Sequence, residues 1–134
     1  MTISAVRSKL AAALETISGL RVYEDWPGQI AEFPAAIIRP MRGDWNTIIP
    51  RTARRDFWQI SIYATLSGGI EQAQQTLEDY LETTGAKSIK TVIEDYTLYG
   101  SVCSFARIIS WSEYGGYEFG GVKYLGVKID LETW

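Results

Sequence analysis

One stretch of the chain, residues 56–65, constrains the fold more than any other. Apolar side chains occupy every second position of it, at Trp58, Ile60, Ile62 and Ala64, and a mixed set alternates with them. Successive side chains of a β-strand point to opposite faces of a sheet, so this spacing predicts a strand with one apolar face. Such a face must be covered by a second layer of structure.

Helical periodicity predicts the segments that supply this layer. Residues 3–17 carry apolar side chains at intervals of three and four, with Ser4 as a candidate cap and Gly19 beyond the end. Residues 70–81 repeat the pattern with acidic side chains on the remaining surface, and we expect this second helix to end near Gly85. Ser88 is a candidate N-cap for a short third helix over residues 89–93.

The other β-prone runs are residues 20–23, 35–38, 102–111 and 122–131. Residues 114–121 contain four glycines and predict the loop of a hairpin between the last two strands. The resulting order α-β-β-β-α-α-β-β is typical of a two-layer α+β domain, with a mostly antiparallel sheet packed by two to three helices. The length of 134 residues and the absence of a linker predict a single domain over residues 1–134.

The amino-acid composition indicates the cellular compartment in which the chain functions. The single cysteine, Cys103, cannot form an internal disulfide, and its place in an apolar run predicts a buried thiol in a reducing compartment such as the cytoplasm. No stretch approaches the roughly 18 apolar residues that a membrane span needs, and the first residues lack the order of a signal peptide. We therefore expect no membrane partner.

The residues that most catalytic sites need are missing. The chain has no histidine, which removes the commonest general base and most zinc sites, and one cysteine cannot form a thiolate cluster. The acidic pairs 24–25, 78–79 and 94–95 are sequence neighbours, so their carboxylates point in different directions and predict solvated surface charge. The glycine cluster at residues 115–121 leads into a strand, unlike a phosphate-binding loop. We expect no enzyme activity, no cofactor and no metal.

Charge is unevenly distributed along the chain. Residues 39–55 hold five arginines against one aspartate, a net charge of +4; the whole chain carries −3, so the remainder carries −7. Arginine and large apolar side chains are interleaved here in a connection of 14 residues, which is long for a compact domain. The candidate interface residues of this segment are Arg42, Trp45, Ile48, Ile49, Arg51, Arg54 and Arg55.

This basic segment has three interpretations. Arginine and tryptophan are enriched at protein interfaces, which favours an arm that docks on another protein. A solvated mobile loop is the second interpretation. Contact with nucleic-acid phosphate is the third, and we rank it last because the acidic remainder of the chain opposes it.

Aromatic side chains in the predicted hairpin loop are a further candidate contact surface. Tyr114, Tyr117 and Phe119 lie among its glycines. An exposed aromatic tip would bind a partner, whereas the same residues folded back on the sheet would be structural. The sequence leaves both alternatives open.

The second half of the chain carries a family resemblance. Gly85, then Ser88 opening a short helix, then Thr97-Leu98 before Gly100 and a strand, is similar to the signature of the tail-terminator (tail-completion) proteins of long-tailed bacteriophages. Residues 19–23, Pro27 and residues 34–38 are similar to the first two strands of that family, and residues 111–115 followed by an apolar strand match its ending. The resemblance covers nearly the whole chain.

The resemblance implies a structural protein of the virion, present in the host cytoplasm during assembly. Such a protein forms a ring with copies of itself, commonly sixfold, on the head-proximal end of the tail tube. Its partners would be the tail tube protein and a head-completion or connector protein, and DNA would pass through the lumen without specific binding. A head-closure or connector protein of the neck is the alternative within virion proteins. A small hydrolase and a nucleic-acid-binding module are alternatives from other classes.

A ring needs two different surface patches that meet between neighbouring subunits. Sheet edges and the arginine segment are the candidates, the arginines reaching the acidic body of a neighbour. This interpretation predicts that reversing the charge of Arg54 and Arg55 weakens assembly in a salt-sensitive way without unfolding the subunit.

Overall fold

The computed structural model describes residues 2–25, 30, 33–45, 54–95, 106–119 and 121–134. Cys103 lies outside these ranges. The predicted order of helices and strands is confirmed. The elements are α1 (Ile3–Glu15), β1 (Arg21–Tyr23), β2 (Ala35–Trp45), β3 (Arg54–Thr65), α2 (Ile70–Leu81), α3 (Ile89–Ile93), β4 (Ala106–Phe119) and β5 (Val122–Thr133).

The strands form one five-stranded sheet in the order β1-β2-β3-β5-β4. The short β1 pairs with β2 in parallel, and every other pair is antiparallel. The central pair is β3 and β5, which join residues far apart in sequence, such as Ile60 opposite Ile129. The predicted two-layer α+β class with a mostly antiparallel sheet is confirmed.

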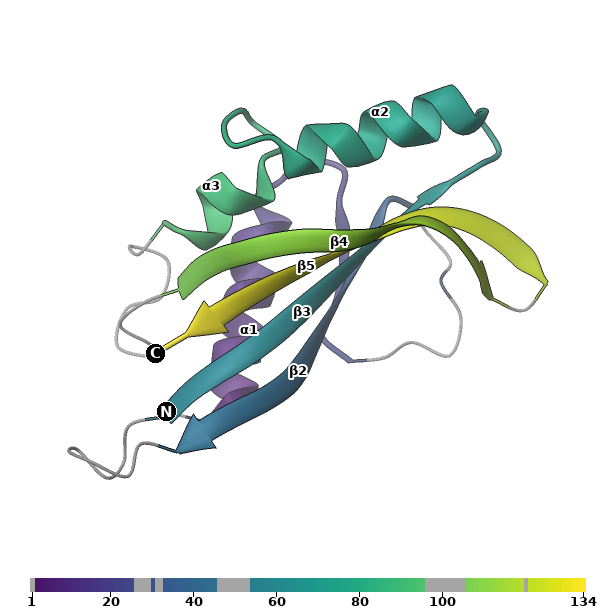
Figure 1. Cartoon of the computed structure of the whole chain (residues 1–134). Helices are drawn as coiled ribbons and strands as arrows, with labels where there is room; N and C mark the ends of the chain where they lie inside the picture. The colour runs from purple at the N-terminus through teal and green to yellow at the C-terminus, as the bar shows by residue number, and fades with distance from the viewer. Residues whose placement is uncertain (1, 26–29, 31–32, 46–53, 96–105, 120) are drawn as a thin grey trace.

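All three helices cover the same face of this sheet (Figure 1). The helical stripe of α1 contributes Val6, Leu10 and Leu14, which are fully buried. The alternating residues of β3 and β5 meet this stripe, and the predicted apolar faces of both strands form the floor of the core. Burial of this apolar surface is the main term that stabilises the two layers.

Side-chain caps define the starts of α1 and α3. The predicted cap Ser4 lies inside α1, and Thr2 takes that role because its hydroxyl accepts the Ala5 N–H at 3.0 Å. The prediction for α3 is confirmed, since the Ser88 hydroxyl accepts the Thr91 N–H at 3.2 Å. The hydroxyl also donates to the Glu82 carbonyl at 2.6 Å, so this buried serine connects the end of α2 to the start of α3.

The prediction of a loop over residues 114–121 is wrong, because β4 continues through this segment to Phe119. Gly115 and Gly116 are paired strand residues opposite Gly126 and Leu125, and the turn itself uses Gly121 at a φ of +83°. Two bulges interrupt β4, one between Ile108 and Ser110 and one between Ser112 and Gly115. Each bulge shifts the register and breaks the alternation that a regular strand would show.

The two long hairpins project from opposite ends of the sheet (Figure 1). β2 and β3 extend past the end of β5, since Thr133 lies opposite Asp56 while Trp45 and Arg54 continue beyond it. β4 and β5 extend the other way, beyond the pairing of Thr65 with Tyr124. The predicted connection of 14 residues is therefore too long, because β2 continues to Trp45 and β3 begins at Arg54.

Candidate functional site

The face of the sheet without helices is divided into an aromatic half and a charged half. Ile37, Tyr63 and Tyr124 form a small buried cluster near β1, where the Phe33 ring stacks on Tyr124 with centroids 4.7 Å apart. The charged half lies towards the tip of the β2–β3 hairpin, where Phe57 and Glu132 face each other across β3 and β5.

Glu132 is the centre of the charged half. Its side chain is fully buried, although it lies on the face that no helix covers. The Arg55 Nε donates to Glu132 Oε2 at 2.8 Å, and Arg107 Nη2 lies 2.6 Å from Oε1. The Arg55 guanidinium also lies 4.9 Å from the Phe57 ring centroid and 5.2 Å from that of Trp134, within the range of cation–π attraction. Two arginines therefore bind one buried carboxylate, and two aromatic rings flank one of these arginines.

The other described arginines of the basic segment also have partners within the chain. Arg42 pairs with Asp44 at 3.0 Å, and Arg54 Nε donates to Asp56 Oδ1 at 2.7 Å. Arg39 donates to Gln59 Oε1 at 3.2 Å. These bonds bear on the prediction that reversing the charge of Arg54 and Arg55 leaves the subunit folded. A glutamate at position 55 would place like charge against the buried Glu132, so we expect this substitution to destabilise the subunit itself. Ile48, Ile49 and Arg51 lie outside the described residues.

Tyr114 and Tyr117 do not form an exposed aromatic tip. Tyr114 packs against the main core, and burial raises the pKa of its hydroxyl, with a smaller contribution from Glu78. Tyr117 packs on the aromatic half, edge-on to Tyr63 with centroids 5.4 Å apart, and donates to the Glu113 carbonyl at 2.6 Å. Burial is also the main cause that raises the pKa of Tyr117. For these two residues the structural alternative is correct; the side chain of Phe119 lies outside the described part.

A hollow of about 400 Å³ lies beside the end of β2, the start of β3 and the start of α1. Its apolar wall includes Trp45, which is 82% exposed, together with Met41 and Ile3, which are nearly half exposed. Its polar lining includes Arg54 and the buried Asp56. Trp45, Arg42 and Arg54 were predicted interface residues, and the structure brings them together here.

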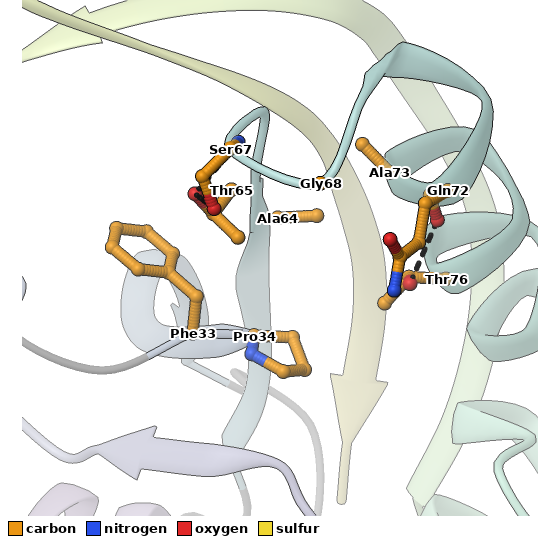
Figure 2. A pocket seen from close by; sticks show the side chains of 9 residues that line it. All are labelled: Phe33, Pro34, Ala64, Thr65, Ser67, Gly68, Gln72, Ala73 and Thr76. Carbon is orange, nitrogen blue, oxygen red and sulfur yellow. Dashed lines mark hydrogen bonds between the residues drawn. The ribbon is translucent and has the colours of Figure 1, made fainter.

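A second hollow of about 230 Å³ lies between the end of β3 and the start of α2. Figure 2 shows Phe33 on one side of it and Gln72 and Thr76 of α2 on the other, with the Thr76 hydroxyl bonded to the Gln72 carbonyl at 2.9 Å. Hydroxyl, amide and apolar groups line it, and none of the lining residues carries a charge or a thiol. This lining offers no general acid or base.

Sequence reasoning missed several residues of these surfaces. Trp111 and Ile109 of β4 are 54% and 47% exposed, but the alternating run gave no sign that the helix layer leaves them uncovered. Glu132 and Arg107 were not singled out, because their partner Arg55 is distant in sequence. Sequence reasoning identified Asp56 only as the first residue of the strand predicted over residues 56–65.

Among the described residues, no three histidine, cysteine, aspartate or glutamate side chains come close enough together to hold a metal ion. In the same part of the chain, no helix has the length and apolar character to cross a membrane.

No protein-family model matches the chain, and no curated protein matches it at significant similarity.

Proposed function

We propose that this chain is a structural protein of a bacteriophage virion that caps the head-proximal end of the tail tube as a ring. In this role it ends tube growth and forms the joint to the head. It acts by assembling, with itself and with the tail tube and connector proteins, and not by catalysis.

The observation that carries the proposal is the geometry of the first part of the signature segment, residues 85–95; Thr97, Leu98 and Gly100 lie outside the described residues. Gly85 has a φ of +114°, which a residue with a side chain rarely adopts, and Ser88 caps α3 three residues later. The serine bonds both helices that it connects. The glycine and the serine that resemble the tail-terminator signature thus both have structural roles, one in a backbone conformation that favours glycine and one as a helix cap.

The distribution of exposed apolar side chains also supports assembly. Ile3 of α1 and Met41 and Trp45 of β2 line one hollow, and Ile109 and Trp111 lie on β4, at the other margin of the sheet. Large exposed apolar side chains that gather in patches are typical of protein interfaces. Two different patches on one subunit are what a ring with head-to-tail contacts requires.

Electron microscopy of particles from a phage with a null mutation in this gene tests the proposal. We expect tails of uncontrolled length beside filled heads without tails, because the tube no longer receives its cap. Tails of normal length that fail to join heads would instead assign the protein to head closure, the alternative within virion proteins. Normal particles would overturn the proposal.

A further inference from the structure

β4 lies at one margin of the sheet, and β5 is the only described strand beside it. Backbone N–H and C=O groups of a strand alternate between its two sides, so a margin strand offers unpaired groups to any further strand. Residues 106–111 of β4 are a favourable target for such pairing, because β-prone and apolar side chains dominate them and Arg107 is their only charge. Ile109 and Trp111 are also half exposed. The start of β4 therefore needs protection from strand addition.

A carboxylate of α3 occupies the margin of β4 at this point. The Ile108 N–H donates to Glu94 Oε2 at 3.0 Å. Because the acceptor lies outside the sheet, this N–H points away from β5, to the side where a further strand would bind. Ala106, two residues earlier, is fully buried. The start of β4 is thus closed to another strand at both residues.

The position of Glu94 is fixed from within α3. Lys90, one turn earlier, donates to both oxygens of the carboxylate, at 2.7 Å and 2.8 Å. At the other end of the helix, Ser88 bonds the end of α2, so α3 is held at both ends. The side chain of Glu94 is only 24% exposed, and a charge-assisted bond that is partly shielded from water is strengthened. The carboxylate can therefore compete with an added strand for the Ile108 N–H.

We propose that Glu94 forms an autoinhibitory contact, which closes the start of β4 against strand addition by another chain. α3 lies beside the start of β4, where this contact forms (Figure 1). Further along the strand, the bulges at Ile108/Ser110 and Ser112/Gly115 interrupt the regular spacing that a pairing strand needs. One carboxylate and two bulges thus protect successive parts of the same margin. This role does not depend on the proposed ring.

Amide hydrogen exchange, resolved by residue, tests the bond. In Glu94→Ala the Ile108 amide should exchange about tenfold faster, because it loses its acceptor. Glu94→Gln keeps an acceptor oxygen and should retain the protection. Glu82→Ala removes an exposed carboxylate at the end of α2 and should leave the exchange of Ile108 unchanged. Equal exchange of this amide in Glu94→Ala and in the unchanged chain would overturn the proposal.

Light scattering at rising protein concentration tests the consequence for association. Glu94→Ala should form larger assemblies than the unchanged chain, whatever the size of the latter. The Ile108 amide should regain its protection in these assemblies, because a strand of a neighbouring chain then accepts its N–H. Assemblies of unchanged size would overturn the autoinhibitory role. Larger assemblies in which the Ile108 amide stays unprotected would also overturn it, because the new contact would lie elsewhere.

A second variant keeps Glu94 itself unchanged. Lys90→Met removes the cation that orients the carboxylate, so the exchange of Ile108 and the assembly size should change in the same directions as in Glu94→Ala, but less. Circular dichroism shows whether each variant folds. If Glu94→Ala does not fold, the comparison rests on Lys90→Met, and the absence of both changes in this variant would overturn the proposal.

Discussion

Arg55 at the start of β3 and Glu132 at the end of β5 form an ion pair across 77 residues of sequence, and the glutamate is fully buried. Arg107 of β4 contacts the same carboxylate, so one buried charge joins three neighbouring strands. A buried charge is stable only while its partners remain, because removing one of them leaves the charge uncompensated.

Arg55→Ala should therefore lower the stability of the subunit. We expect a loss of roughly 1–3 kcal/mol, since Arg107 still forms an ion pair with Glu132 but the other carboxylate oxygen, Oε2, loses its hydrogen-bond donor. Urea denaturation followed by circular dichroism measures it. Arg39→Ala removes an exposed arginine bonded to an amide and should change stability by no more than about 0.5 kcal/mol. Equal effects of the two substitutions would contradict a structural role for Glu132.

Gly126→Ala should be destabilising for a steric reason. A methyl group at this position of β5 would lie 2.7 Å from the Tyr63 ring and 2.8 Å from the Tyr117 ring, too close for either ring to stay in place. We expect a loss of about 1–3 kcal/mol in thermal or urea unfolding, typical of overpacking. Gly116→Ala on β4 has open space and serves as the matched control. If both variants unfold alike, the packing of the two tyrosines on Gly126 is not as described.

Stability should fall at alkaline pH because of Tyr80. Burial raises the pKa of its hydroxyl to about 12, with a smaller contribution from Asp79. The folded state thus holds a proton that the unfolded state, with a tyrosine pKa of about 10, releases. The contribution to stability is complete below pH 10 and is lost as the pH rises through 12. Tyr80→Phe removes this titration and also a buried hydroxyl without a partner, so it should be less sensitive than the unchanged chain between pH 10 and 12.

Much of this fold was predictable because its elements have regular periods. The alternation in β3 and β5, the helical spacing in α1 and the cap at Ser88 are local patterns, and each was confirmed. The strand order was not predictable, since pairing depends on contacts between distant segments. The end of β4 was missed for a physical reason: the bulges at Ile108/Ser110 and Ser112/Gly115 break the period-two pattern, and glycines that pair in a strand look like a turn.

The candidate site was predictable only in part. Trp45 and Arg42 could be selected because arginine and tryptophan are frequent at interfaces. The bonds that hold Arg54 and Arg55 to carboxylates of their own chain depend on the register of β3 with its neighbours, which no local pattern reveals. The exposure of Trp111 depends on how far the helices cover the sheet.

Ser88→Ala should cost more than removal of an exposed cap. The Ser88 hydroxyl is buried, donates to the Glu82 carbonyl and accepts the Thr91 N–H, so its loss removes two hydrogen bonds that connect α2 and α3. We expect a loss of about 1–2 kcal/mol in urea unfolding. Thr2→Ala removes the exposed cap of α1 and should cost less. A larger effect at Thr2 would show that the signature serine has no special structural role.

The chain should not bind DNA even at low ionic strength. Its net charge is −3, and the described arginines of the basic segment already bond carboxylates or an amide of the same chain. A phosphate would have to displace those partners, and the acidic body would repel it. Fluorescence anisotropy of a short labelled duplex should therefore stay constant as protein is added. Binding that weakens steeply with added salt would indicate counterion release from phosphate contacts and would favour a nucleic-acid-binding module over a capping ring.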